Sequence, residues 1–336
     1  MTNYKTIHGK KVKYLSSDPP AAIGEGQVWY NSPAANFKAA VTVEAWSSGA
    51  AHPTANRHGF ASGTQTAALY ASGYVGPQPS PPANLMLVGT FEYDGSSWTA
   101  GGDVNSRAFI GGSAGTQTAS LKMGGNMPSG ANRGEVEEYN GTSWAEQSDL
   151  PTGTQTNTGI GIQTAALSVS GGADTDITLE YDGSSWTAGG NLSGSARVRG
   201  FGSGTQTAGM YSGGALGTSP YAVQTAVEQY DGSSWSSLPA SLNAGQAGYT
   251  SNNVGTSSRD TAIVAGGHSP PGTGSNTGAT QIYDGSTWRT APSMATARQT
   301  SLTGDSSAAL VVGGGSNTTA VEEFSAADTV KVITDS

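Results

Sequence analysis

Apolar and polar residues alternate along this chain over short segments that turn residues interrupt. Residues 136–139, Val-Glu-Glu-Tyr, read as one short strand, and Trp144 begins the next strand after an Asn-Gly-Thr-Ser turn. No long stretch places apolar residues at the spacing of a helix. The pattern therefore predicts an all-β chain of short strands joined by hairpins.

One six-residue pattern recurs and marks the turn between two strands. In each copy a Tyr and a Trp enclose an Asp or Asn, then a Gly, then two Ser or Thr residues. The Asp or Asn supplies a side-chain acceptor and the Gly tolerates a positive φ, so these four residues favour a hairpin. The copies end at Trp98, Trp144, Trp186, Trp235 and Trp288.

These tryptophans are 46, 42, 49 and 53 residues apart, by subtraction of their numbers. A period of about 40 to 50 residues is typical of propeller blades and of helical arrays. The 50 glycines among 336 residues exclude helical arrays. Because stacked repeats build one continuous core, we expect one propeller in place of the two domains that length alone would allow. The Tyr and Trp of each copy should pack one blade against the next.

Each repeat unit holds four candidate strands. In the second unit we expect strands over residues 107–111, 118–123 and 135–139, and a fourth that begins at Trp144. Counting second strands gives six units, or about 24 strands, with atypical ends. The turn between the first two strands is a Gly-Thr-Gln-Thr-Ala stretch, found at residues 63–67, 115–119 and 204–208, with a variant at 161–165.

Two glycines end the second strand of most units. The first unit has Ser72 and Gly73 in that place. The last unit is degenerate, because Phe324 replaces the Tyr and residues 329–334 replace the Trp strand. The paired glycines begin at Gly124, Gly171, Gly213, Gly266 and Gly313.

Paired glycines at a strand end, then a Glu-Tyr strand, then a Trp resemble kelch repeats over residues 52–334. The Tyr and Trp here are closer together than is usual in kelch repeats, which the tight Asp-Gly-Ser-Ser turn accounts for. The resemblance implies four-stranded blades with the first strand innermost and the fourth outermost. We therefore predict a six-bladed, kelch-like β-propeller over residues 39–336, preceded by an N-terminal arm and hairpin over residues 1–38.

The N-terminal arm differs in charge from the rest of the chain. Residues 1–38 carry five Lys against one Asp and one Glu, a net of +3, which leaves −12 of the total −9 for the remainder. Residues 27–32 read as a strand and turn, with a return strand over 37–43. The lysines form either a solvated tail or a docking arm for an acidic partner surface. Residues 26–32, Gly-Gln-Val-Trp-Tyr-Asn-Ser, are similar to a segment near the N-termini of virion structural proteins of marine tailed phages, which implies docking to a particle.

Composition narrows the candidate chemistry. The chain has no Cys, which excludes disulfides, thiolate metal sites and the Cys–Tyr cofactor of copper radical oxidases. Only 12% of residues are charged and the propeller is acidic, so no nucleic-acid partner is expected. No stretch approaches the roughly 18 apolar residues of a membrane span, and the N-terminus lacks the apolar core of a secretory signal.

No catalytic or metal-binding constellation stands out. His52 and His58 are six residues apart, a spacing that fits no common set of metal ligands. We expect all four histidines, which include His8 and His268, at surface or packing positions. Asp174 and Asp176 read as solvated turn residues. Gly-x-Ser-x-Gly is absent, and the adjacent Asp and Gly of the turns differ from a sialidase Asp-box. We expect no enzyme activity, no metal and no cofactor.

Five arginines lie just before or at the start of an expected innermost strand, and aromatic residues follow three of them. In a propeller these positions converge on one mouth of the channel, which is also the end where loops of variable length, at residues 73–84 and 172–176, follow the paired glycines. The arginines either brace loops by binding carbonyls or form a ring that binds an anion or a sugar. The residues are Arg57, Arg107, Arg197, Arg199 and Arg298, with Phe60, Phe109 and Phe201.

These observations favour a non-catalytic virion structural protein of a phage, such as a tail fibre, a receptor-binding protein or a decoration protein. The propeller would attach to a host-surface glycan or protein, and residues 1–38 would bind other virion proteins. It could act singly or as a homo-oligomer in the particle. The alternatives are a kelch-type module that binds protein partners and a carbohydrate-active enzyme, for which an acid–base constellation is missing.

Overall fold

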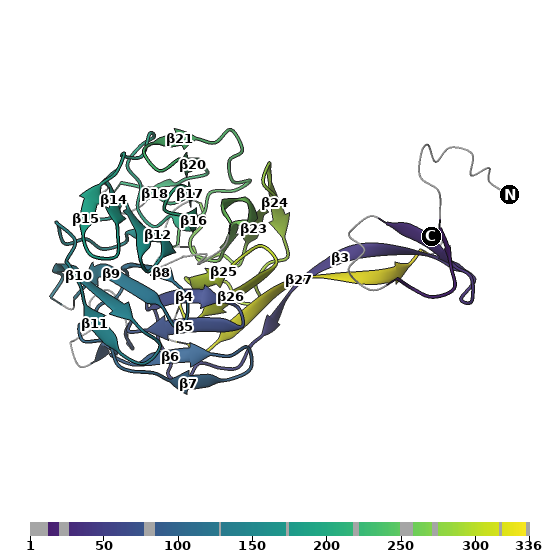
Figure 1. The fold of residues 1–336 in the computed structure, drawn as a ribbon, viewed down its shortest axis with the longest axis horizontal. Helices are drawn as coiled ribbons and strands as arrows, with labels where there is room; N and C mark the ends of the chain where they lie inside the picture. The colour runs from purple at the N-terminus through teal and green to yellow at the C-terminus, as the bar shows by residue number, and fades with distance from the viewer. Residues whose placement is uncertain are drawn as a thin grey trace. The chain divides into compact units, whose positions relative to one another are not determined.

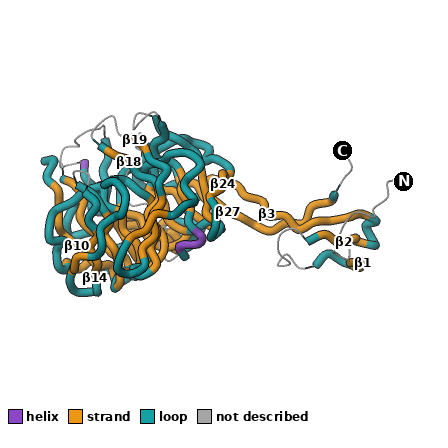
Figure 2. Tube along the Cα trace, turned by 90° about the horizontal axis from the view of Figure 1, so that it is seen from above, coloured by secondary structure: helices purple, strands orange, loops and turns teal. Residues whose placement is uncertain are grey.

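The computed structural model describes residues 13–19, 27–76, 85–127, 129–172, 175–217, 222–248, 258–270, 275–315 and 318–333. The chain is almost entirely strand and loop, and its small sheets form a six-bladed β-propeller (Figures 1 and 2), which confirms the predicted fold class. Two compact units are present, Trp46–Phe324, which contains the propeller core, and Met1–Ala45 with Ser325–Ser336.

Each of the first three blades contains four strands, and each strand pairs with the one that follows it in the chain. Blade 1 consists of β4 (Phe60–Thr64), β5 (Ala67–Ala71), β6 (Thr90–Tyr93) and β7 (Trp98–Ala100). Blade 2 consists of β8 (Gly112–Gly115), β9 (Ser120–Asn126), β10 (Asn132–Tyr139) and β11 (Trp144–Glu146). Blade 3 consists of β12 (Thr158–Ile162), β13 (Ala165–Val169), β14 (Thr178–Tyr181) and β15 (Trp186–Ala188).

Blades 4 to 6 continue around the ring. Blade 4 consists of β16 (Phe201–Thr205), β17 (Ala208–Ser212), β20 (Val227–Tyr230) and β21 (Trp235–Ser237), with a small hairpin of β18 (Ala215–Leu216) and β19 (Ala222–Val223). The described part of blade 5 consists of η3 (Arg259–Thr261), a single 3-10 turn, β22 (Ile263–Ala265), β23 (Thr280–Tyr283) and β24 (Trp288–Ala291). Blade 6 consists of β25 (Ser301–Gly304), β26 (Ala308–Val312), β27 (Val321–Val332) and β3 (Asn36–Ser48).

In blades 6, 1, 2, 3 and 4 the first strand in chain order is the innermost one. Strands β25, β4, β8, β12 and β16 contact one another in that order around the axis (Figure 1). The strand predicted over residues 107–111 is wrong, because blade 2 begins with β8 at Gly112. Ile110 has a φ of +53°, which breaks an extended strand at that point. The fourth strand does begin at Trp144, as predicted.

The six-residue pattern forms the hairpin between the third and fourth strands. In blade 1, Asp94 Oδ1 accepts the backbone N–H of Ser96 at 2.8 Å and of Ser97 at 2.7 Å. Gly95 follows with a φ of +90°, where an L side chain would be strained. Bonds from the two serines hold the carboxylate in its charged form and lower the pKa of Asp94 to about 2. The same turn occurs at Asn140, Asp182, Asp231 and Asp284.

Each repeat Tyr packs against the Trp five residues later. The ring centroids are 4.8, 5.1, 4.8, 5.0 and 5.4 Å apart for the pairs that end at Trp98, Trp144, Trp186, Trp235 and Trp288. Trp144, Trp235 and Trp288 are buried, and Trp98 and Trp186 are half-buried. The indole N–H of Trp144 donates to Thr90 Oγ1 of blade 1, and that of Trp235 to Thr178 Oγ1 of blade 3, both at 2.8 Å. The pairs therefore join blades as well as hairpins.

Two further side-chain ties link neighbouring blades. Gln163 of blade 3 donates to the carbonyls of Ser120 at 3.1 Å and Tyr139 at 2.7 Å in blade 2. The hydroxyl of Tyr181 donates to Glu138 Oε1 of blade 2 at 3.0 Å. Each such bond contributes about 0.5–1.5 kcal/mol net. The glutamine tie recurs at Gln65, Gln117 and Gln206, and the tyrosine tie at Tyr93, Tyr139 and Tyr230.

Blade 6 is closed by a strand from the N-terminal part of the chain. Trp46 of β3 takes the place of a repeat Trp, with its ring centroid 5.3 Å from that of Phe324. Its indole N–H bonds to Thr280 Oγ1 and to the carbonyl of Pro292, both at 3.0 Å, in blade 5. The separate strand predicted over residues 329–334 is wrong, because β27 runs without interruption from Val321 to Val332.

The second unit is a small sheet made from both ends of the chain. Strand β1 (Lys13–Leu15) pairs parallel with β2 (Val28–Asn31), which pairs antiparallel with β3 and confirms the predicted hairpin. Within this unit Thr42 Oγ1 donates to Asp328 Oδ1 at 2.9 Å. Asp18 accepts bonds from Asn31 Nδ2 at 2.6 Å and from Lys38 Nζ at 2.5 Å.

Candidate functional site

One backbone position recurs at the mouth where the innermost strands begin. Two residues before β4, β8, β12 and β16, the backbone has a positive φ, at His58, Ile110, Thr156 and Arg199. The N–H of Ile110 donates to the carbonyl of His58 at 3.1 Å, and that of Thr156 to Ile110 at 2.5 Å. Arg199 N–H donates to Thr156 at 3.2 Å. Hydrogen bonds therefore pass from blade to blade around this mouth.

A polar cluster occupies part of the same mouth. His58 Nε2 lies 2.6 Å from Gln299 Oε1, and Gln299 Nε2 lies 3.2 Å from His268 Nε2, so residues of blades 1, 6 and 5 meet. Burial lowers the pKa of His58 to about 3, and the charges of Arg57 and Arg199 act in the same direction. Burial, then the charge of Arg199, lowers the pKa of His268 to about 4. Both imidazoles are neutral at physiological pH.

The buried histidines should make the propeller sensitive to mild acid. His58 takes up a proton near pH 6.5 in the unfolded chain but only near pH 3 when folded. Between those values the unfolded state binds more protons than the folded state. The free energy of unfolding therefore decreases by about 1.4 kcal/mol for each unit by which the pH is lowered, as the contribution of this group. Urea unfolding at several pH values should show a shallower acid loss in His58→Gln. Parallel pH profiles of parent and variant would contradict the burial of a neutral imidazole.

The predicted arginines differ in their surroundings. Arg57 is buried, donates to the carbonyls of Gly315 at 2.8 Å and of Gly76, and lies over the ring of Tyr74 at 4.9 Å. Arg107 is exposed. The contacts of Arg57 are those expected of an arginine that braces loops.

Two other arginines are paired with buried carboxylates. Arg197 Nη2 lies 2.7 Å from Glu228 Oε1, and Arg298 Nη1 forms an ion pair with Glu322 Oε1. Arg298 Nε also donates to the carbonyl of Gly313 at 3.0 Å. Arg199 is buried at the mouth beside the histidines. The structure thus brings Arg199 to the polar cluster and uses Arg197 and Arg298 within the blades.

The aromatic residues predicted beside the arginines belong to the core. Phe60, Phe109 and Phe201 are all buried. Lys122 Nζ lies 5.4 Å above the centroid of the Phe60 ring, and the Phe109 ring packs edge-on against Tyr74 at 4.9 Å. Their faces are covered by the protein itself.

A buried carboxylate in blade 2 holds the connection that enters the blade. Glu137, two residues before the repeat Tyr, accepts the backbone N–H of Asn105 at 2.7 Å and of Ser106 at 2.9 Å. Lys122 Nζ lies 2.8 Å from Glu137 Oε1, and both side chains are almost fully buried. We refer to this acceptor, its backbone donors and its side-chain partner as the clamp of the blade.

Three further blades contain a clamp. In blade 5 the acceptor is a neutral amide in place of a carboxylate. The groups are Glu228 with Ser193 and Arg197 in blade 4, Gln281 with Asn243 and Gln246 in blade 5, and Glu322 with Ala295 and Arg298 in blade 6.

Blade 3 has lost its clamp. Leu179 stands where the acceptor would be, two residues before Tyr181, and it pairs across the strands with Ser168. Pro151, which has no backbone N–H, stands at the position of the donor. Thr154 occupies the position that Arg197 has in blade 4. These smaller or apolar residues leave a cavity of about 420 Å³.

Blade 1 has lost the same two groups but fills the space. Phe91 replaces the acceptor and Pro53 the donor. The ring of His52 packs edge-on against Phe91 at 4.7 Å, Trp98 at 4.9 Å and Tyr70 at 5.1 Å. Burial in this cluster lowers the pKa of His52 to about 4. The cavity therefore belongs to blade 3.

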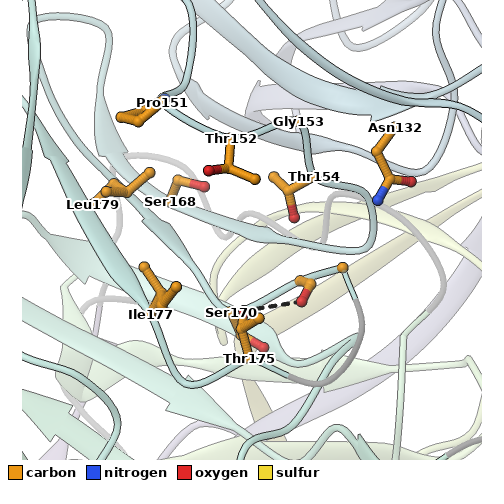
Figure 3. A pocket seen from close by; sticks show the side chains of 12 residues that line it. Asn132, Pro151, Thr152, Gly153, Thr154, Ser168, Ser170, Thr175, Ile177 and Leu179 are labelled. Carbon is orange, nitrogen blue, oxygen red and sulfur yellow. Dashed lines mark hydrogen bonds between the residues drawn. The ribbon is translucent and has the colours of Figure 1, made fainter.

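Figure 3 shows the side chains that line the cavity. The cavity lies at the same end of the blade as the mouth, because the N–H of its lining residue Gly172 donates at 2.8 Å to the carbonyl of Gln155, which precedes Thr156. None of the described residues that line the cavity carries a charge. The lining residues are Asn132, Pro151, Thr152, Gly153, Thr154, Ser168, Ser170, Gly171, Gly172, Thr175, Ile177 and Leu179.

The sequence placed the paired glycines of blade 3 one residue too late. Ser170 and Gly171 have φ values of 63° and 109°, which match the 64° and 115° of Gly124 and Gly125. Gly172 instead belongs to the loop that lines the cavity. The missed signal was Leu179, because the units of blades 2, 4, 5 and 6 have Glu or Gln at this position, two residues before the repeat Tyr or, in blade 6, before Phe324.

Some predicted features fall outside the described residues, namely His8, Asp174 and most of the loop at 73–84. Over the ranges that the structure describes, no group of three or more His, Asp or Glu could hold a metal, and no helix is long and apolar enough to cross a membrane. No protein-family model matches the chain, and no curated protein sequence matches it either.

Proposed function

We propose that this chain is a non-catalytic virion appendage protein of a tailed phage, with a kelch-like propeller that attaches to a host-surface glycan or protein. The observation that carries the proposal is the division of the chain. Trp46–Phe324 forms the propeller unit, while both chain ends form a second unit. A separate unit that contains most of residues 1–38 is suited to bind other virion proteins, and this leaves the propeller for recognition.

The use of the ionisable groups supports binding over catalysis. Glu137, Glu228 and Glu322 are buried acceptors of backbone N–H groups and partners of basic side chains. His58 and His268 are buried with lowered pKa values, so neither is poised to exchange a proton near neutral pH. These groups stabilise the fold, which is what a rigid display scaffold requires.

Mass spectrometry of purified particles tests the proposal. We expect the chain among the virion proteins, and we expect the isolated propeller to bind host cells in a saturable manner. Absence of the chain from extensively washed particles, or a stable complex with a soluble intracellular protein, would instead support the kelch-type protein-binding module.

A further inference from the structure

The cavity of blade 3 results from several coordinated residue differences. In a clamped blade, removal of the carboxylate alone would leave a backbone N–H without its acceptor. Here Pro151 removes the first of the two N–H donors and Leu179 removes the acceptor, while the second donor position is held by the exposed Thr152. Thr154 and Ser168 are also smaller than Arg197 and Lys122 at the equivalent positions of blades 4 and 2. These changes leave a space at the place of the clamp.

The described residues leave this space open, although protein interiors are normally close-packed. In blade 1 the ring of Phe91 stands at the acceptor position and packs edge-on against His52. In blade 3 about 420 Å³ stays open, within the range of about 300–1,000 Å³ typical of small-molecule pockets. A cavity of this size with a built lining is suited to an external ligand.

The lining combines apolar and polar side chains. Pro151, Ile177 and Leu179 supply apolar surface. Thr152 and Ser168 lie beside Pro151 and Leu179, and Asn132 and Thr154 lie across the view from them (Figure 3). Ile177 is 46% exposed, so its apolar surface is accessible from solvent. The polar lining residues offer hydroxyl and amide groups, and the lining residues that the structure describes are uncharged.

We propose that this cavity binds one neutral sugar residue, an inference that rests on the proposed attachment function and names its ligand class. A sugar ring has an apolar C–H face that suits the Pro-Ile-Leu wall, and hydroxyls that suit the Thr and Asn groups. A carboxylate or an amine would lose its hydration here without meeting an opposite charge. The site therefore selects against charged sugars.

Titration of the full chain with single sugars tests the inference. The probes are galactose and N-acetylglucosamine, with glucuronic acid as the charged comparison, followed by ligand-observed NMR. We expect at least one neutral probe to bind saturably. Glucuronic acid should bind at least about tenfold more weakly, which is a difference of about 1.4 kcal/mol or more. Equal or tighter binding of glucuronic acid, or no binding of either neutral probe, overturns the proposal.

Two matched variants place the binding in the cavity. Thr152 is exposed at the cavity, so Thr152→Trp should block it and weaken binding of the neutral probe about tenfold or more. Thr296 is its equivalent at the entrance to blade 6, because Leu150 and Met294, two residues earlier, each donate a 2.8 Å backbone bond to the preceding blade, at Gly134 and Gly278. Thr296→Trp should leave binding unchanged. Loss in both variants, or in neither, overturns the assignment to the cavity.

A third variant fills the cavity with a side chain that another blade already carries at the same position. Gln246 of blade 5 is the equivalent of Thr154, so Thr154→Gln should fold without an exposed ring, fill the cavity and weaken sugar binding. Cell binding by Thr152→Trp that equals the parent overturns the cavity proposal while attachment stands. Absence of the chain from particles overturns the virion role, while the sugar titration still decides the cavity.

Discussion

A chain that lacks residues 1–48 should be less stable by about 3 kcal/mol or more than one that lacks only residues 1–35. The longer deletion removes all of β3, including Trp46–Ser48, which lie in the propeller unit. Blade 6 then loses its outermost strand, and β27 becomes an unpaired edge. It also loses the contacts of Trp46 with Phe324 and Thr280.

Differential scanning calorimetry of the two truncated chains measures this effect. The deletion of residues 1–35 removes β1 and β2 and serves as the control, because no residue of the propeller unit is lost. In that shorter background Trp46→Ala should reproduce a large part of the loss. Equal melting of the propeller in both truncated chains would show that β3 is not needed to close the ring.

Replacement of the buried carboxylate of blade 2 should be comparably costly. Glu137→Leu leaves the ammonium of Lys122 buried without its counter-charge, and it leaves the N–H groups of Asn105 and Ser106 without their acceptor. Breaking a buried ion pair from one side destabilises proteins by about 3–5 kcal/mol. Chemical denaturation should show this loss as a lower midpoint with an unchanged slope.

The double variant Lys122→Met with Glu137→Leu separates charge from packing. It removes both members of the ion pair, so we expect it to recover much of the stability lost by Glu137→Leu alone. Addition of Asn105→Pro would reproduce the Pro-and-Leu combination of blade 3. If the double variant is no more stable than Glu137→Leu, the bonds to the backbone N–H groups dominate the clamp.

The blade count and the hairpins could be predicted because they depend on local chemistry. The Asp-Gly-Ser-Ser turn encodes its own hydrogen bonds, which makes each copy readable without knowledge of its neighbours. The closure of blade 6 could not be read in this way. Trp46 lacks the preceding turn, and its partners Thr280 and Phe324 are more than 230 residues away.

The candidate site was predicted less well for a related reason. The start of each innermost strand does place Arg57 and Arg199 at one mouth, but the partners of Arg197 and Arg298 are carboxylates on other strands of the same blade. The cavity arises because blade 3 lacks the clamp residues that fill this place in other blades. Leu179 and Pro151 look ordinary in the sequence and become informative only beside the clamps of the other blades.

The distribution of ties between blades gives the ring an uneven local stability. Glutamine and tyrosine ties link blades 6, 1, 2, 3 and 4, but Gln229 and Ile282 replace the acceptor Glu in blades 4 and 5, and Phe324 has no hydroxyl to donate. Among the described residues, blade 5 is therefore bound to its neighbours by fewer such bonds. Blade 5 should therefore open at a lower free energy than the whole propeller. Its amide hydrogens should exchange faster than those of the other blades, under conditions in which the rest of the ring stays folded.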